Sequence, residues 1–310
     1  MSVTLFSPLT AVLGGVWALL LLATAVVWRL EPASAVNGEL RPRVRSWWLI
    51  VVLCSLALTL SRTAALLFFT LVSFLALKEY LTLIPTRRAD RRVLLWAYLS
   101  IPVQYFWIHI EWYGMFIIFI PVYLFLLLPV AMVLSGETQG HLRTAGSLHW
   151  GLMSMVFGLS HLAYLLVLPQ AQYPHVSGAG LVLFLLLLTE LNDVAQYCWG
   201  KGLGKHKISP TVSPNKTVEG FVGGVVTTVL LSALLAPWLT PFSTVDALLA
   251  GALIAVAGFF GDLSLSALKR DLGIKDSGNL LPGHGGILDR VDSLTYTAPL
   301  FFHFIRYFYF

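Results

Sequence analysis

The feature that most constrains this chain is a succession of long apolar runs. A membrane-spanning helix needs about 20 apolar residues to cross roughly 30 Å of hydrocarbon. Ten runs qualify, some of them marginally: residues 8–28, 47–61, 63–83, 93–108, 113–134, 148–167, 178–199, 219–236, 246–268 and 294–310. The second and third runs are separated only at Ser61-Arg62-Thr63, so these two could instead form one re-entrant hairpin. We expect an all-α polytopic integral membrane protein with eight to ten transmembrane helices, ten being preferred.

The composition excludes a soluble chain. Hydrophobic residues make up 57% of the 310 residues and charged residues only 11%, whereas an ordinary globular chain has about 25% charged residues. So few charges could not cover the apolar surface of a water-soluble fold. The net charge of +5 is explained by basic loops on one side of a bilayer, so we expect lipid and no nucleic acid as a partner.

The basic residues predict the orientation. Five connections, at 29–46, 84–92, 136–147, 200–218 and 269–293, alternate along the chain with four others at 62, 109–112, 168–177 and 237–245. Every Lys and Arg lies in or beside the first set, except Arg62 and Arg306. Because cytoplasmic loops carry an excess of Lys and Arg, we expect these five connections in the cytoplasm, both termini outside, and a location in the bacterial inner (cytoplasmic) membrane.

The two halves of the chain differ in their polar residues. Residues 1–177, with six spans, contain almost no candidates for chemistry, and a lipid-access surface or a homodimer surface are two alternatives for them. Residues 178–310 carry clustered acids and bases in the spans and in the loops 200–218 and 269–293. We therefore expect an active site at the cytoplasmic face of the C-terminal half.

The first candidate cluster lies around the seventh run. Glu190 and Asp193 are three residues apart, so on a helix they share a face. In the following loop, Ser213-Pro214 is a helix-start signal with Ser213 as N-cap. That start would place Lys216 and Thr217 in the first turn, where free N–H groups and the helix dipole favour phosphate.

The second cluster runs from Asp262 to Asp292. Asp262, Ser266 and Lys269 follow an i, i+4, i+7 spacing and share one helical face. Beyond them come Arg270, Lys275, Asp276, His284, Gly285, Gly286, Asp289, Arg290 and Asp292. Mg²⁺ prefers a few carboxylate oxygens together with water and substrate phosphates. Carboxylates among Lys, Arg and Gly at one membrane face therefore indicate a metal–polyphosphate site.

These residues resemble the signature of the phosphatidate cytidylyltransferases, also called CDP-diglyceride synthetases. The family signature is Ser-x-x-Lys-Arg, four residues, Lys-Asp, then His-Gly-Gly-x-x-Asp-Arg-x-Asp, and residues 266–292 match it. The upstream pattern Asp-x-x-x-Tyr-x-x-Gly, followed by Ser-Pro-x-Lys-Thr-x-Glu-Gly, matches residues 193–200 and 213–220. The resemblance implies transfer of a cytidylyl group from CTP to phosphatidate with Mg²⁺, giving CDP-diacylglycerol and pyrophosphate.

Carried over onto this chain, the resemblance implies a set of roles. The metal ligands would be Asp262 and Asp289. The catalytic residues would be Asp262, Asp289, Lys269, Arg270, His284 and Asp292. The substrate-binding residues would be Asp193, Ser213, Lys216, Thr217, Ser266, Lys275, Asp276, Gly285, Gly286 and Arg290. Two positions depart from the family pattern: Leu265 stands where Glu is common, and Gln196 where a small residue is usual.

Three alternatives stay open at this point. The chain could be a paralogue that acts on another lipid phosphate. It could be a CTP-dependent kinase of an isoprenoid alcohol, in which case CDP and not pyrophosphate is released. In a transporter, Glu190, Asp193 and Asp262 would be coupling carboxylates, but polar residues would then be distributed along a transmembrane path, whereas here nearly all cluster at one face.

Overall fold

The computed structural model of the chain describes residues 7–29, 35–85, 91–134, 136, 138–168, 173–174, 176–278 and 285–310. The first half comprises α1 (Pro8–Arg29), α2 (Ala35–Leu60), α3 (Arg62–Leu83), α4 (Arg91–His109), α5 (Tyr113–Ile118), η2 (Phe119–Leu124), α6 (Phe125–Val133), α7 (His141–Gly151), η3 (Leu152–Gly158), α8 (Leu159–Tyr164) and η4 (Leu165–Val167). The second half comprises α9 (Gly178–Leu203), β1 (Lys207–Ser209), β2 (Ser213–Thr217), α10 (Val218–Leu239), α11 (Thr244–Asp271), α12 (Leu288–Val291) and α13 (Leu294–Tyr309).

The prediction of a polytopic helical protein is confirmed. Within the described residues, eight helical stretches are long and apolar enough to cross a membrane. The two other predicted spans, 93–108 and 294–310, form the helices α4 and α13 of 19 and 16 residues. Among the described residues, the only β-sheet is the short antiparallel hairpin β1–β2.

The second and third runs form two separate helices and not one re-entrant hairpin. Helix α2 has 26 residues and α3 has 22, which at 1.5 Å per residue makes each at least about 33 Å long, enough to cross the hydrocarbon. Ser61 separates them and caps α3, because its side chain accepts the backbone N–H of Ala64 at 3.0 Å. Since α2 begins at Ala35, Arg41, Arg43 and Arg45 lie on a helix and not in a connection.

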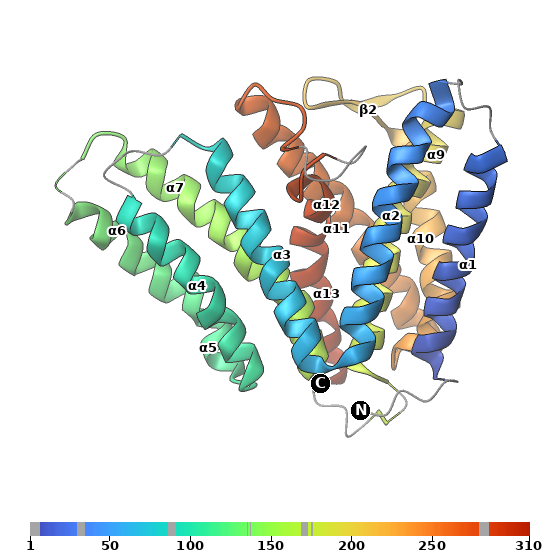
Figure 1. Cartoon of the computed structure of the whole chain (residues 1–310), viewed down its shortest axis with the longest axis horizontal. Coiled ribbons are helices and arrows are strands. Elements are labelled where there is room, and N and C mark those ends of the chain that lie inside the picture. Colours follow the sequence, from blue (N-terminus) through green and yellow to red (C-terminus); the bar gives the residue numbers. More distant parts are fainter. Residues whose placement is uncertain are drawn as a thin grey trace.

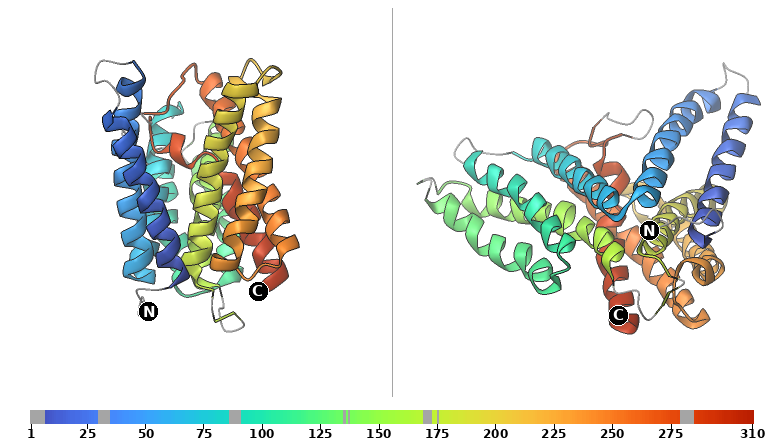
Figure 2. Two further views of the ribbon diagram at one scale, coloured as in Figure 1. Left: turned by 90° about the vertical axis from the view of Figure 1, so that its right-hand side faces the viewer. Right: turned by 60° about the horizontal axis from the view of Figure 1, so that its bottom comes forward.

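The helices form a bundle with two distinct ends (Figure 1). Helix α1 begins and α13 ends at one end, whereas the hairpin β1–β2, the end of α11 and the helix α12 lie at the other. Helices α4 to α7 form one side, α1, α2 and α10 the other, and α3 and α13 stand between them (Figure 2). The alternation of connections predicted from the basic residues is therefore present, while the side that faces the cytoplasm stays a prediction.

Buried polar contacts fix the three helices that support the second half. The Thr228 hydroxyl of α10 donates to Asn192 Oδ1 of α9 at 3.1 Å, and Asn192 Nδ2 donates to the Ala255 carbonyl of α11 at 3.3 Å. A Cβ on Gly224 would meet the Gln196 side chain at 2.3 Å, so this glycine lets α9 and α10 approach closely. Because α9, α10 and α11 are held in register, the side chains at their common end are placed together.

The two basic residues at the opposite end are both engaged. Arg62 Nη1 lies 2.8 Å from Glu111 Oε1, and Arg62 Nη2 donates to the His109 carbonyl at 3.3 Å. The Arg306 guanidinium lies 3.6 Å from the centre of the Tyr113 ring. These contacts join α3 to the end of α4 and the turn after it, and α13 to the start of α5, which accounts for two cations at an end that is otherwise poor in them.

Candidate active site

Two aspartate–lysine ion pairs mark the end of the bundle that carries the hairpin. The first joins Asp262 of α11 to Lys216 of β2, with Asp262 Oδ2 and Lys216 Nζ 2.7 Å apart. Ser266, one turn along α11, donates its hydroxyl to Asp262 Oδ1 at 3.1 Å. The Lys216 ammonium also lies over the Phe259 ring, 4.5 Å from its centre. The shared helical face predicted for Asp262 and Ser266 is confirmed.

The loop that holds Lys216 folds differently from the prediction. The expected helix start at Ser213-Pro214 is wrong, because residues 213–217 form β2 and pair with β1. The helix begins four residues later at Val218, and the cap is Thr217, whose hydroxyl accepts the Gly220 N–H at 3.1 Å. The extended backbone satisfies ladder hydrogen bonds that a helix at Pro214 would forgo. Lys216 therefore reaches Asp262 from a strand and not from a helical turn.

The second ion pair joins Lys269 of α11 to Asp289 of α12. Lys269 Nζ lies 2.7 Å from Asp289 Oδ1, and the two side chains are only 13% and 8% exposed. The other carboxylate oxygen, Oδ2, accepts the Ser277 N–H at 3.0 Å, the Ser277 hydroxyl at 2.9 Å and the Gly286 N–H at 3.1 Å. Asp289 thus organises the loop around it.

The charge of Asp289 follows from these partners. Burial by itself would raise the pKa of the Asp289 carboxyl, but Lys269 and the N–H groups of Ser277 and Gly286 outweigh it. The net result is a pKa below the ordinary value. Asp289 is therefore a carboxylate at neutral pH, as binding a cation requires.

A third group of acids lies beside the first pair. Burial, together with the nearby carboxylates Asp262 and Asp193, raises the pKa of Asp292 well above its ordinary value. Asp193 Oδ2 accepts the Ser293 hydroxyl at 3.0 Å. These three acids come from α9, α11 and the residue after α12, so the fold brings together two clusters that lie about seventy residues apart in the sequence. A bound cation would relieve their mutual repulsion.

Glu190 and Arg290 lie beside this group. Glu190 of α9 is close enough to Arg290 and Asp292 to interact with their charges. Arg290 is therefore a cationic neighbour for Glu190, to which the sequence assigns no partner. Among the described residues, the Arg290 Nε is buried without a hydrogen-bond partner. A buried unpaired guanidinium N–H is costly unless a ligand supplies an acceptor, so Arg290 fits the predicted phosphate-binding role.

Other predicted site residues lie apart from the ion pairs. Arg270 is exposed; its Nε donates to the Val212 carbonyl at 3.1 Å and so holds the tip of the hairpin. Lys275 and Asp276 are exposed on the segment after α11. Ser213 was expected to cap a helix, but it begins β2, and the helix starts only at Val218. His284 lies outside the described residues.

A functional residue that the sequence interpretation missed is Glu79 of α3. Its Oε2 accepts the Ile287 N–H at 2.9 Å and its Oε1 accepts the Leu288 N–H at 3.3 Å. The Ser277 hydroxyl lies within hydrogen-bond distance of this carboxylate as well as of Asp289, and its single proton is donated to one of them at a time. Glu79 therefore caps α12, the helix that carries Asp289, from the other half of the chain. An acid within a predicted span was the available signal, but its partners lie some two hundred residues away.

The Gly285-Gly286 pair makes room for both carboxylates. Gly285 has φ +76°, and a Cβ there would meet Asp289 Oδ2 at 2.4 Å. A Cβ on Gly286 would meet Glu79 Oε1 at 1.8 Å. A side chain at either position would displace an acid, which is a physical reason for glycine at both.

The donor set is compatible with Mg²⁺ shared between protein and substrate. In the part of the chain that the structure describes, no group of three or more His, Cys, Asp or Glu residues could hold a metal by itself. Mg²⁺ commonly takes one or two carboxylates and completes its shell with water and phosphate oxygens. Asp262 and Asp289, each with a lysine on one oxygen, offer that kind of partial coordination.

Comparison with known proteins gives matches along most of the chain. A family model described as "Cytidylyltransferase family" matches residues 41–308. The chain is 50% identical to "Uncharacterized protein YnbB" of Escherichia coli K12 over 299 residues, 95% of this chain and 97% of that protein. It is 42% identical to the phosphatidate cytidylyltransferase of Staphylococcus aureus (strain COL) over 124 residues, 40% of this chain and 48% of that one. The Staphylococcus haemolyticus enzyme of the same name is 40% identical over the same length. The chain thus matches about half the length of the staphylococcal enzymes.

Proposed function

Since the chain belongs to the cytidylyltransferase family, we propose that it transfers the cytidylyl group of CTP to phosphatidate, releasing pyrophosphate and leaving CDP-diacylglycerol in the membrane. Membership supports a nucleotidyltransferase that uses CTP. The acceptor, the metal requirement and the role in phospholipid synthesis are our proposal. The observation that carries it is the pair of shielded aspartate–lysine contacts at one end of a membrane-spanning bundle.

The reaction needs charge neutralisation more than it needs a base. A phosphate oxygen of phosphatidate attacks the α-phosphorus of CTP, and the bond from that phosphorus to the bridging oxygen breaks as pyrophosphate leaves. The attacking phosphomonoester is largely dianionic near neutral pH, so it carries no proton that must be removed first. The main barrier is bringing two anions together in line, and preorganised cations lower it.

The residues divide this task by their charge. Lys216, Lys269 and Arg290 would contact phosphate oxygens, since two of them are ammonium groups at the acids and the third has an unpaired buried N–H. Asp262 and Asp289 would hold Mg²⁺, which supplies positive charge to the α-phosphate and to the leaving pyrophosphate. On binding, each lysine exchanges its carboxylate partner for a phosphate oxygen.

The fold suits a lipid acceptor and a soluble donor. The ion pairs join α11 to β2 and to α12, which lie toward one end of the bundle (Figure 1), and the helices beside them are long and apolar enough to cross a bilayer. We therefore expect the ion pairs near the level of the phospholipid phosphates. By the distribution of Lys and Arg, that end would face the cytoplasm, where CTP is available. Phosphatidate would enter laterally, with its two acyl chains remaining in lipid.

The test uses the position of the label in CTP. The purified full chain in detergent receives Mg²⁺, phosphatidate and CTP labelled at either the α- or the γ-phosphate. We expect the α-label to enter the lipid fraction and the γ-label to leave as pyrophosphate in equal amount. A γ-label in the lipid with release of CDP would instead identify a kinase and refute cytidylyl transfer. Lysophosphatidate and isoprenoid glyceryl phosphates, tested in parallel, show whether another lipid phosphate is the preferred acceptor.

A further inference from the structure

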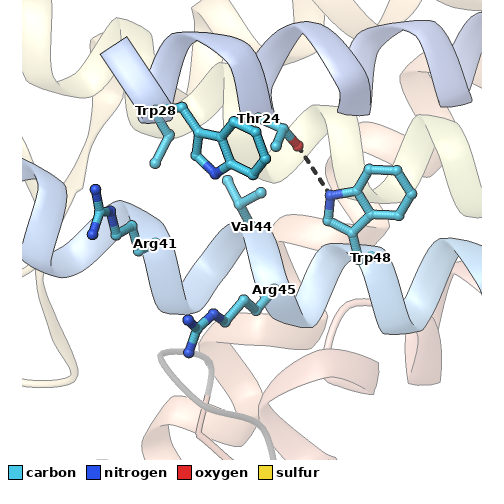
Figure 3. Close-up of a pocket in the computed structure, with 7 residues that line it drawn as sticks. Thr24, Trp28, Arg41, Val44, Arg45 and Trp48 are labelled. Atoms are coloured by element: carbon cyan, nitrogen blue, oxygen red, sulfur yellow. Dashed lines mark hydrogen bonds between the residues drawn. The ribbon is translucent and has the colours of Figure 1, made fainter. Parts of the chain in front are cut away.

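A hollow of about 520 Å³ lies between α1 and α2, outside the site described above. It is lined by Thr24, Val27, Trp28, Arg41, Val44, Arg45 and Trp48. In Figure 3, Thr24 and Trp28 point from α1 toward α2, and Arg41 and Arg45 extend in different directions from the part of α2 that precedes Trp48, Arg45 on the side of α2 away from α1. The residues that line the hollow belong to the last turns of α1 and the first half of α2, and these parts of the two helices lie toward the end of the bundle that carries β2 and α12 (Figure 1).

Two arginines supply one end of this hollow with positive charge. Arg41 and Arg45 are four residues apart on α2, so they lie on one helical face, and both are exposed. Over the described parts of the chain, neither has a hydrogen-bond or ion-pair partner. Guanidinium groups match phosphate oxygens in a two-pronged geometry. The basic end of the hollow is therefore open to a phosphate group.

The other end is a fixed aromatic wall. Trp48 Nε1 donates to the Thr24 hydroxyl at 2.9 Å, which joins α2 to α1. The Trp17 ring packs edge-on against Trp48 with centres 5.5 Å apart, and Trp17 Nε1 donates to the Ser55 hydroxyl at 3.1 Å. Indole rings of this kind are enriched at the headgroup level of membranes. The wall places the arginines, up to about 10 Å further along α2, in the headgroup layer.

Below the wall, both helices present apolar side chains to their surroundings. Leu49, Leu53 and Leu56 of α2 and Leu19 and Leu22 of α1 are between 43% and 63% exposed. Both helices are long and apolar enough to span a membrane. A phosphate held by the arginines would therefore have hydrocarbon directly beneath it, as a phospholipid has and a soluble phosphate lacks.

We propose that the hollow between α1 and α2 binds the headgroup of an anionic glycerophospholipid, with its phosphate at the basic end lined by Arg41 and Arg45 and its acyl chains along α1 and α2. The occupant is a lipid because the arginines, the tryptophans and the exposed leucines follow one another along the helices. The headgroup, the glycerol and the acyl chains of a phospholipid follow in the same order. Basic pockets between membrane helices bind such headgroups. The site keeps an anionic lipid next to the end of the bundle where the ion pairs lie.

The test measures lipid binding without CTP, so that its outcome does not depend on the proposed activity. Native mass spectrometry of the full chain in detergent gives the apparent affinity for the first bound phosphatidylglycerol. Dioleoylglycerol, which lacks the phosphate, and glycerol 3-phosphate, which lacks the chains, are used as competitors. Arg41→Gln and Arg45→Gln are compared with Arg43→Gln, which removes the same charge from an exposed position on α2 outside the hollow.

We expect Arg41→Gln and Arg45→Gln each to weaken binding about tenfold, as loss of a charge-assisted contact to phosphate would, and Arg43→Gln to leave it nearly unchanged. Neither competitor should displace the lipid. Equal losses in all three variants would show attraction to net charge and overturn the proposal, as would unchanged binding in the first two. Displacement by glycerol 3-phosphate would assign the hollow to a soluble phosphate and refute the lipid.

Discussion

Glu79 allows the sharpest test of how the active end is assembled. In Glu79→Ala the N–H groups of Ile287 and Leu288 lose their acceptor, whereas the Ser277 hydroxyl keeps Asp289 as an alternative. Leaving a buried donor unsatisfied costs about 1–3 kcal/mol. Because these donors are only partly buried, we take the lower half of that range for each, about 2–4 kcal/mol in total. The hydrogen-bonded arrangement of Ile287 and Leu288 should then be about 30- to 700-fold less favoured, since 1.4 kcal/mol is a factor of ten.

Hydrogen exchange measures this quantity directly. In the native chain, the amides of Ile287 and Leu288 should be protected, and in Glu79→Ala they should exchange faster by that factor while α9 and α10 keep their protection. Glu79→Gln retains one acceptor oxygen and should show about half the effect in free energy. Lys78→Gln is the control, because Lys78 is exposed one position away on α3. Unchanged protection in Glu79→Ala would refute the capping role.

Four further predictions concern the same end of the molecule. Asp289→Asn should lower cytidylyl transfer at least about a hundredfold, as loss of a preorganised charge does, measured as labelled lipid at saturating CTP; full activity would contradict its assignment. The pKa of Asp289 in the folded chain lies below its ordinary value of 3.8, so the Asp289 carboxylate contributes its full stabilisation of the fold above that pH. This stabilisation is lost as the pH falls through the folded pKa. The difference in thermal unfolding temperature between the native chain and Asp289→Asn should therefore become smaller below pH 3.8. Gly286→Ala should reproduce the exchange pattern of Glu79→Ala, since its Cβ would occupy the position of the Glu79 carboxylate. Thr217→Ala should destabilise the start of α10 by about 1 kcal/mol in thermal unfolding, and Thr217→Ser, which keeps the acceptor for Gly220, should not.

The helices could be predicted from the sequence because burial in lipid imposes a single local rule. Each span must be apolar over its whole length and must satisfy its own backbone, so the runs locate helices without knowledge of their neighbours. The boundary at Ser61 was also visible, since a serine before a new run is a capping signal. The ambiguity over a re-entrant hairpin arose because Arg41, Arg43 and Arg45 interrupt the apolar pattern of the first turns of α2, so that the second run looked too short to span.

The site was predictable only where its residues lie close along the chain. Asp262, Ser266 and Lys269 follow helical spacing and lie on one helix, and the shared face is confirmed for Asp262 and Ser266 by their hydrogen bond. The β1–β2 hairpin was missed because Ser213-Pro214 is compatible with an extended strand as well as with a helix start. Which of the two forms depends on pairing with residues 207–209. Glu79 was missed because its partners are set by tertiary packing. The predicted division at residue 177 stays a prediction, and the contacts of Glu79 cross it.

If the site binds the proposed cation and polyphosphate, the two ion pairs would also couple the binding of these ligands to one another. An anion that took Lys269 alone would leave Asp289 buried without its counter-ion, and a divalent cation that took Asp289 alone would leave Lys269 in the same condition. Each ligand removes the cost that the other would incur, and the same holds for Lys216 and Asp262. Binding is then cooperative in both directions: whatever factor the cation adds to the affinity for the polyphosphate, the polyphosphate adds to the affinity for the cation.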